Sequence, residues 1–368
     1  MKPTVALFGA SVRWLAQSAH RAGFRVLACD LFGDEDLREV ADVKTITRAE
    51  YPQGFKRIAD EWIGIPRVYA GGLENHPDVV EHFERTGPLW GCQAETLKRC
   101  RTPTALQACG IPTPDVQLDP EGVPTDGSWL VKPIKGSGGF GIRRWRGDSL
   151  PKECFLQRRI EGEPVSASYL ALANRTVLIG ASLQFIGEAW SGASEFAYSG
   201  GMAPIRLSPK ARTDLRRIGK RLSDRLGLRG LFGLDAVRNG DEWTFVEINP
   251  RPMASMELFE LAEVASMFEL HVASFGGAYK KWRTVNRIAG KAIVFATNPC
   301  QLSEKLPGQV QSFRFADRPA AGSAFAAGDP ITTVLARAVT QEDLQARLQV
   351  GVEDLRKRLK MVDGQRLT

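Results

Sequence analysis

Residues 231–248 contain two short apolar segments separated by the dipeptide Asn239-Gly240. This dipeptide between two such segments is the strongest short-range signal of a β-hairpin, because both residues tolerate the positive φ angles of a two-residue turn. The segments 231–238 (LFGLDAVR) and 243–248 (WTFVEI) are therefore predicted to form an antiparallel pair of strands. This pairing restricts the fold more than any other feature, since it decides which side chains share one face of a sheet.

One face of this hairpin carries polar side chains. Glu247 and Asn249 are two residues apart and so point to the same side of their strand, with Asp235 on the opposing strand. Carboxylate and amide oxygens are the ligands that Mg²⁺ (or Mn²⁺) prefers, with phosphate and water completing its shell. We therefore predict that Asp235, Glu247 and Asn249 hold a divalent ion. Arg251, two residues further on, is predicted to be catalytic, steadying a substrate carboxylate and the charge that develops as it reacts.

A second polar motif lies in the segment 129–142 (WLVKPIKGSGGFGI). A short apolar strand brings in Lys132, which is predicted to contact phosphate as a point charge and to take part in catalysis. The loop that follows is rich in glycine, so its N–H groups can approach and fold over the β- and γ-phosphates of a nucleotide. The loop residues predicted to bind phosphate are Gly136, Ser137, Gly138 and Gly139. The loop is not a P-loop, because no GKS or GKT follows it.

The N-terminus follows a different pattern. Residues 4–8 form a short apolar segment that ends at Gly9, residues 12–23 have the pattern of a helix, and residues 24–30 form a second apolar strand. This order is typical of a βαβ unit with parallel strands. We therefore predict a Rossmann-like domain at about residues 1–95. The dinucleotide fingerprint is absent, since the second and third glycines of GxGxxG are missing.

Two interpretations are open for the turn after this first strand. Ser11 and Arg13, at the N-terminus of the predicted helix, could hold an anionic group of the substrate. Alternatively, the segment is a plain turn between a strand and a helix. The sequence does not separate the two.

Composition limits the classes of function. Hydrophobic residues at 43% and charged residues at 25% are typical of a globular enzyme, and the net charge of +7 is spread along the chain. No zinc finger, RNP motif or basic arm is present, so nucleic acid is not an expected partner. No apolar segment approaches the roughly 20 residues of a membrane helix, so no membrane partner is expected either.

The cysteines and histidines fit the same class. The six cysteines have no CxxC spacing and the N-terminus has no signal-peptide pattern, so a cytoplasmic location with buried thiols is expected. The four histidines, at positions 20, 76, 82 and 271, lie outside the polar motifs and are expected at the surface or in the packing.

A lysine and glycine loop followed by an acidic hairpin, in this order, resembles the ATP-grasp superfamily, and the resemblance covers most of the chain. Segments 182–205 and 291–338 are similar to ATP-grasp carboligases related to biotin carboxylase. The implied fold is α/β, with a Rossmann-like domain, an ATP-grasp core with a lid subdomain, and a biotin-carboxylase-like C-terminal part. The implied boundaries are 1–95 for the first domain, 96–290 for the ATP-grasp domain with its lid at about 115–165, and 291–368 for the closing subdomain and C-terminal helix.

The resemblance also implies contacts to ATP. The segment 155–172 (FLQRRIEGEPVSASYLAL) is similar to the strand that carries the family's adenine contacts, and Glu163 is implied to contact ribose. The residues implied to contact adenine are Gln157, Arg158, Arg159 and Ile160. The family's phosphate-binding lysine precedes a turn like Gly-Ile-Pro-Thr-Pro. By spacing that position falls on Arg99, with Lys98 beside it, and the sequence does not choose between them.

The implied activity is that of an ATP-dependent carboxylate–amine ligase, an enzyme that forms a C–N bond and releases ADP and phosphate. A substrate carboxylate attacks the γ-phosphate, and an amine then attacks the acyl phosphate. Residues 9–37 resemble a subset of carboligases with a suspected role in making one-carbon carriers of the tetrahydromethanopterin or methylofuran kind. That resemblance would make an anionic cofactor precursor one of the small-molecule substrates.

Two other functions on this fold stay open. One is a bicarbonate-activating carboxylase or a kinase, and the other is a non-catalytic ATP-binding regulator. The bicarbonate-using branch carries Glu-His after its Asn-x-Arg motif, whereas Pro-Met-Ala-Ser-Met-Glu257 follows Arg251 here, which argues against a biotin-type carboxylase. The oligomeric state is also open, with a homodimer as the common state of the superfamily.

Overall fold

The computed structural model describes residues 2–263, 266–280 and 287–361. Its N-terminal part is a four-stranded sheet in the order β3-β2-β1-β4, in which every pair of neighbours is parallel. The strands are β1 (Thr4–Phe8), β2 (Arg25–Asp30), β3 (Ala41–Thr45) and β4 (Arg67–Tyr69). The helices are α1 (Arg13–Arg21), α2 (Glu35–Arg38), α3 (Gly54–Glu61), the short 3-10 helix η1 (Leu73–Asn75) and α4 (Pro77–Thr86). The predicted βαβ unit is confirmed, with α1 connecting the parallel strands β1 and β2.

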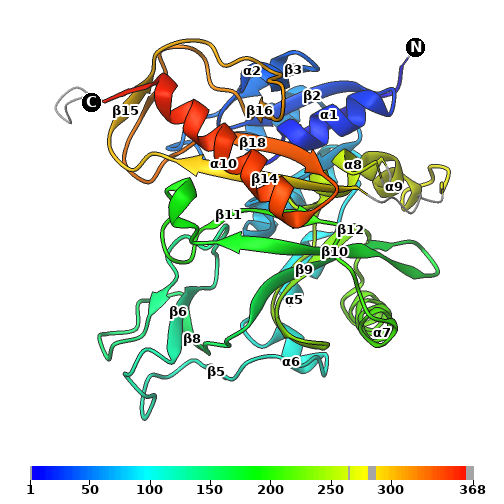
Figure 1. The fold of residues 1–368 in the computed structure, drawn as a ribbon. Coiled ribbons are helices and arrows are strands. Elements are labelled where there is room, and N and C mark those ends of the chain that lie inside the picture. Colours follow the sequence, from blue (N-terminus) through cyan, green and yellow to red (C-terminus); the bar gives the residue numbers. More distant parts are fainter. Residues whose placement is uncertain (1, 264–265, 281–286, 362–368) are drawn as a thin grey trace.

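Two short helices, α5 (Ala94–Cys100) and α6 (Ala105–Ala108), connect this part to a small antiparallel sheet. Pro103 separates the two helices, as its missing N–H and ring clash predict. The small sheet has the order β5-β8-β6-β7 and lies within the region predicted as the lid. Its strands are β5 (Val116–Gln117), β6 (Trp129–Pro133), β7 (Arg143–Arg144) and β8 (Cys154–Arg158). In Figure 1 this lid sheet lies at the lower left, away from the N-terminal strands at the top.

The centre of the molecule is an eight-stranded sheet in the order β13-β12-β9-β10-β11-β14-β18-β16, antiparallel throughout. Its strands are β9 (Glu163–Ala171), β10 (Thr176–Ile186), β11 (Tyr198–Ala203), β12 (Gly230–Asn239), β13 (Glu242–Asn249), β14 (Ile288–Phe295), β16 (Arg314–Ala316) and β18 (Pro330–Ala338). β14 and β18 thus continue the sheet that contains the predicted ATP-grasp strands. The predicted boundary at residue 291 falls inside β14, and the division into domains stays a prediction.

Helices cover both faces of this sheet (Figure 1). α7 (Pro209–Leu226) packs on one face against β9 and β10, while α8 (Met256–Leu261) and α9 (Met267–Ala273) pack on the other. α10 (Gln341–Arg358) covers β14 and β18. The remaining elements are the 3-10 helix η2 (Ala189–Ser191) and a three-stranded sheet of β15 (Cys300–Leu302), β17 (Ala324–Phe325) and β19 (Leu359–Met361). In the described part of the chain no helix is long and apolar enough to cross a membrane.

Two short helices, α8 and α9, follow the hairpin. α8 ends at Leu261, and Glu263 has a φ of 65°, in the left-handed region that does not continue a right-handed helix. α9 then begins anew, with the Ser266 side chain accepting a hydrogen bond from the Glu269 N–H at 3.4 Å.

The expected packing roles of the cysteines and of His271 are confirmed. All six cysteines are free thiols and all but the half-buried Cys154 are buried. The His271 ring is fully buried between β12 and the N-terminal part, where Nδ1 accepts from the Leu231 N–H at 3.1 Å and Nε2 lies 3.0 Å from the Trp90 carbonyl. Burial lowers the pKa of His271 to about 4, although the Trp90 carbonyl acts in the opposite direction.

This low pKa predicts acid sensitivity. His271 is neutral when folded but has a pKa of about 6.5 when unfolded. The contribution of neutral His271 to the free energy of unfolding is therefore fully present above about pH 6.5. It decreases as the pH falls toward 4, by at most about 3 kcal/mol. Urea denaturation at pH 7.5 and 4.5 should show a smaller decline for His271→Gln than for the wild type. Equal declines in the two proteins would contradict this account.

Candidate active site

The hairpin of β12 and β13 brings together the three residues predicted to bind a metal. Its register pairs Asp235 with Glu247, and the turn glycine Gly240 has a φ of 59°, as the turn type requires. The Asn249 side chain donates from Nδ2 to Asp235 Oδ2 at 2.9 Å. The three side chains therefore form one polar row across the hairpin, as the alternation of residues predicted.

The two carboxylates of this row have different electrostatic environments. Burial raises the pKa of Asp235 to about 6, helped by the charge of Glu247 and opposed by hydrogen bonds from Ser166 and Asn249. Burial would also raise the pKa of Glu247, but the charges of Arg101 and Lys132 outweigh it and hold that pKa below its usual value. Glu247 is thus the more firmly ionised of the pair.

Lys132, at the end of lid strand β6, faces this acidic row. Its ammonium group donates to Gln157 Oε1 on the neighbouring strand at 3.0 Å. Burial lowers the pKa of Lys132, while the charges of Glu247 and Asp235 act to raise it. A cation held here by Gln157, within the field of two carboxylates, is placed to share its charge with an incoming phosphate.

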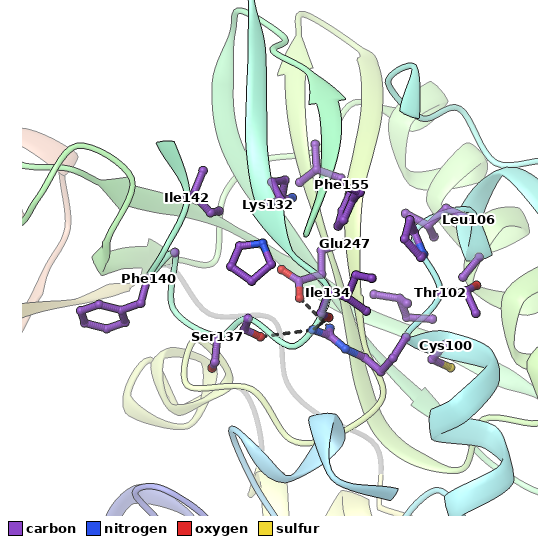
Figure 2. Close-up of a pocket in the computed structure, with 18 residues that line it drawn as sticks. Cys100, Thr102, Leu106, Lys132, Ile134, Ser137, Phe140, Ile142, Phe155 and Glu247 are labelled. Carbon is purple, nitrogen blue, oxygen red and sulfur yellow. Dashed lines mark hydrogen bonds and ion pairs between the residues drawn. The ribbon is translucent and has the colours of Figure 1, made fainter. Parts of the chain in front are cut away.

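A pocket joins Lys132, Glu247 and the glycine loop. Figure 2 shows Lys132, Glu247 and Ser137 around one space, with Phe140 pointing away from it. Three of the four loop residues predicted to bind phosphate, Gly136, Ser137 and Gly139, line this pocket, and Gly138 lies between them in the loop. Its other walls are mostly apolar: Leu106, Ile134, Ile142, Phe155 and Ile248. The pocket therefore combines charge at one side with an apolar surface that suits a planar base.

Arg101 connects the acidic row to the glycine loop, and the sequence analysis missed it. Its guanidinium donates to Glu247 Oε1 at 2.7 Å and to the carbonyls of Ile134 and Gly136 at 3.0 and 3.2 Å. With 10% of its side chain exposed, Arg101 lies against the pocket wall. The sequence has arginines at both 99 and 101, and only the fold shows that Arg101 is the one that contacts Glu247.

The structure does not place Arg99 or Lys98 at this position, and a phosphate contact from either residue stays a prediction. Arg99 is exposed and donates to Thr96 Oγ1 at 3.2 Å within α5, and Lys98 is exposed and pairs with Glu95. Neither lines the pocket. α5 ends at Cys100, so Arg101, whose side chain contacts Glu247, lies just beyond the helix.

The N-terminal part contributes to the site through η1. Glu74 pairs with Arg251 at 2.7 Å, and Arg251 also donates to Asn249 Oδ1 at 3.2 Å. Asn75 donates to the Gly136 carbonyl of the glycine loop at 3.1 Å. The predicted catalytic arginine is therefore beside the predicted metal ligands, but its orientation depends on a carboxylate from another part of the chain.

Arg13 does not have a free guanidinium for an anionic substrate. Its side chain is buried and pairs with Glu257 and with Asp317 Oδ1, the latter at 2.9 Å. Asp36 lies 3.6 Å away, and Lys291 also approaches Glu257, at 3.3 Å. The structure thus favours the second interpretation, a plain turn between a strand and a helix. Arg13 instead connects α1 to α8 and to the C-terminal part of the chain.

The residues implied to contact adenine and ribose lie near the pocket without lining it. Gln157 is buried beside Lys132, Arg158 is exposed near Asp115, and the Arg159 N–H donates to the Ser128 carbonyl at 2.8 Å. Ile160 is half-buried, and Glu163 pairs with Arg238 at 2.5 Å. Their contacts with a nucleotide stay predictions.

Several buried polar atoms around the site have no hydrogen-bond partner among the described residues. They are Arg101 Nε, Glu74 Oε2, Asn75 Oδ1 and the Tyr198 hydroxyl. A buried polar atom without a partner is unfavourable. A polar ligand bound here would supply partners for these atoms.

The donor set suits a magnesium ion that shares its shell with a nucleotide. No group of three or more His, Cys, Asp or Glu side chains in residues 2–263, 266–280 and 287–361 could hold a metal by itself. Two carboxylates and one amide, on the other hand, leave positions for phosphate oxygens and water, which is how Mg²⁺ is usually bound with ATP.

The closed position of the glycine loop depends on Gly139. This residue has a φ of 81°, and an added Cβ would lie 1.8 Å from the Phe196 carbonyl oxygen. Gly139→Ala is therefore expected to displace the loop and to weaken MgADP binding about tenfold, since the loop's N–H groups would leave the phosphates. Isothermal calorimetry would measure the change. Gly122→Ala, at a φ of 73° with nothing within 4 Å, is the control for backbone strain alone, and equal effects of both variants would contradict the prediction.

Comparisons with known proteins agree with this geometry. Residues 98–255 match a family model described as the ATP-grasp domain. A formate-dependent phosphoribosylglycinamide formyltransferase from Synechococcus sp. (strain CC9311) is 26% identical, over 74% of this chain and 76% of the relative. Other relatives of the same name match over only 18% or 20% of their own length.

Solved structures show the same fold. The biotin carboxylase domain of the Hydrogenobacter thermophilus 2-oxoglutarate carboxylase, in complex with MgADP and bicarbonate, has a TM-score of 0.72 at 14% identity, over 97% of this chain and 90% of that one. N5-carboxyaminoimidazole ribonucleotide synthetase from Thermus thermophilus has a TM-score of 0.68 at 17% identity, over 95% of this chain and 98% of that one. At such identities the similarity establishes the fold.

Proposed function

We propose that this chain is an ATP-dependent carboxylate–amine ligase of the ATP-grasp superfamily, whose family model matches residues 98–255. One observation carries the proposal. Lys132, Arg101 and the glycine loop meet the acidic hairpin at a single pocket. Phosphate-binding cations and metal-type oxygens at one place are what transfer of a phosphoryl group to a carboxylate needs.

The pocket would offer different surroundings to the two ends of ATP. The apolar walls formed by Leu106, Phe155 and Ile248 would receive the base. Lys132, Arg101 and the loop residues Gly136–Gly139 would contact the phosphates. Asp235, Glu247 and Asn249 would hold Mg²⁺, which when bound neutralises charge on the phosphates.

In the proposed reaction a carboxylate oxygen attacks the γ-phosphorus in line, and the bond from that phosphorus to the ADP oxygen breaks. Lys132 and Arg101 offset the negative charge that accumulates. Arg251, held by Glu74, would orient the carboxylate. An amine then attacks the acyl carbon, a C–N bond forms, the C–O bond to phosphate breaks, and the proton of the amine leaves to solvent.

The acyl phosphate must be protected from water, because hydrolysis would release it without product. The glycine loop is held over the pocket by Asn75, by Arg101 and by a hydrogen bond from the Tyr198 N–H to the Gly138 carbonyl at 2.9 Å. These contacts would break and re-form as nucleotide enters and leaves.

The substrates are proposed to be a small carboxylate and an amine. The formate-dependent transferase named above supports this class, as does the bicarbonate in the named carboxylase complex. A place in one-carbon-carrier synthesis, with an anionic cofactor precursor as substrate, rests on the resemblance of the N-terminal segment alone. A homodimer and a cytoplasmic location likewise stay predictions from the superfamily and from the sequence.

The test is ADP release from MgATP with formate, bicarbonate, acetate or an amino acid, each with and without an amine. The proposal requires release that depends on both components. A carboxylate labelled with ¹⁸O should transfer one labelled oxygen to the released phosphate, because that oxygen forms the bond to phosphorus and stays with it. Release that depends on bicarbonate without an amine would support the carboxylase alternative, and MgATP binding without turnover would support a regulator.

A further inference from the structure

Tyr198 connects the glycine loop to the eight-stranded sheet. It is the first residue of β11, and its N–H donates to the Gly138 carbonyl at 2.9 Å. The loop also contacts the preceding residue, since a Cβ on Gly139 would lie 3.2 Å from the Ala197 Cα. The Tyr198 backbone thus holds the loop that is predicted to bind phosphate. Tyr198 also pairs with Ile186 of β10, two residues from Gln184, whose side chain donates to Asp235 Oδ1 at 2.9 Å.

The hydroxyl of Tyr198 is buried and has no hydrogen-bond partner among the residues that the structure describes. Burial raises the pKa of Tyr198, and the charges of Asp235 and Glu257 raise it further. The hydroxyl therefore keeps its proton at every physiological pH and can donate a hydrogen bond. The charges that act on the hydroxyl thus come from the acidic hairpin and from α8.

The two carboxylates whose charges act on the hydroxyl already accept hydrogen bonds from other donors. Asp235 Oδ1 accepts from Gln184 Nε2 and Oδ2 accepts from Asn249 Nδ2, both at 2.9 Å. Both oxygens of Glu257 accept from Arg13, and Oε2 also accepts from Lys291 at 3.3 Å. Both carboxylates therefore have other donors, and among the described residues neither is a hydrogen-bond partner of the Tyr198 hydroxyl.

We propose that the Tyr198 hydroxyl donates a hydrogen bond to the substrate carboxylate and keeps it on the acyl phosphate. This inference rests on the proposed function and specifies its carboxylate subsite. The acceptor is the carboxylate oxygen that does not attack phosphorus, so it carries negative charge before the phosphoryl transfer and is the carbonyl oxygen afterwards. When the amine attacks, charge returns to this oxygen, and the same O–H would stabilise it.

The test is Tyr198→Phe, which removes only the hydroxyl oxygen. Formate, bicarbonate, acetate and glycine serve as carboxylate probes, with hydroxylamine as a general amine that converts an acyl phosphate to a hydroxamate. For each probe that the wild type uses, kcat/KM for the carboxylate is expected to fall roughly 10- to 100-fold, as loss of a hydrogen bond to a charged group predicts. The Kd for MgADP and the melting temperature should not change beyond their errors.

Tyr169→Phe is the matched control. Tyr169 lies on β9 with its ring on the opposite face of the same sheet, and its hydroxyl donates to the Leu215 carbonyl at 3.1 Å. This variant is expected to lower the melting temperature without changing the KM for the carboxylate. Comparison of the two variants therefore distinguishes the loss of a substrate contact from the loss of a structural hydrogen bond.

The outcomes distinguish this inference from the function on which it rests. If Tyr198→Phe keeps the wild-type kcat/KM for the carboxylate, or weakens MgADP binding by the same factor, the inference is overturned and the ligase proposal stands. If the wild type binds MgADP but releases ADP with none of the four probes in the presence of hydroxylamine, both are overturned. A fall in kcat/KM for the carboxylate, with MgADP binding unchanged, supports both the inference and the ligase proposal.

Discussion

Glu247→Gln is expected to lower the rate of carboxylate-dependent ADP release by about 10²- to 10³-fold, the cost typical of removing one electrostatic group from an active site. Glu247 is kept ionised by Arg101 and Lys132, and a neutral amide cannot balance these two cations or bind a divalent ion as strongly. Binding of MgADP should weaken as well, so the stabilisation of the protein by saturating MgADP should shrink. Both effects are measured on the same protein, by coupled assay and by thermal unfolding.

Glu242→Gln is the control for this variant. Glu242 begins the same strand, β13, and is exposed beside the hairpin turn. The same chemical change there is expected to leave turnover and MgADP binding unaltered. Turnover within threefold of the wild type in Glu247→Gln would show that this hairpin does not hold the metal.

Arg101→Ala is expected to weaken MgADP binding by about 10- to 100-fold, because a charge-assisted contact to phosphate is lost. The variant also removes the hydrogen bonds to the carbonyls of Ile134 and Gly136, so the glycine loop should exchange its amide hydrogens faster. Calorimetry measures the first effect, and hydrogen exchange over residues 136–139 the second.

Arg99→Ala is the control, and it tests the family spacing against the fold. Arg99 is two residues away but exposed on α5, with its guanidinium on Thr96. We expect a change of less than twofold in MgADP binding. A larger loss in Arg99→Ala than in Arg101→Ala would reverse the assignment and restore the one that spacing suggests.

The site depends on contacts between parts of the chain that are distant in sequence. Glu74 and Asn75, from one turn of 3-10 helix, contact Arg251 and the glycine loop, respectively. The Tyr69 hydroxyl also donates to the Pro250 carbonyl at 3.2 Å, so β4 touches the end of β13. Packing of the N-terminal part against the hairpin therefore helps to orient the predicted catalytic arginine.

The sequence alone determined the elements whose chemistry is local. Asn239-Gly240 predicted the hairpin, and the spacing of two between Glu247 and Asn249 placed both on the face of Asp235, because strand side chains alternate with a period of two. The glycine loop after Lys132 was also identified from the sequence, because a strand end followed by four glycines can be recognised without knowledge of the tertiary structure. The parallel N-terminal unit followed from the order of its apolar segments.

Only the tertiary structure decided which distant side chains meet. Arg101 rather than Arg99 reaches Glu247, because α5 ends at Cys100 and the direction of the chain changes there. Arg13 was open to two interpretations until Glu257 and Asp317 were found around it. The unpartnered hydroxyl of Tyr198 has no signal in the sequence. Local spacing fixes neighbours within one strand or turn, whereas these contacts depend on how separate elements pack, and packing is set by the whole core.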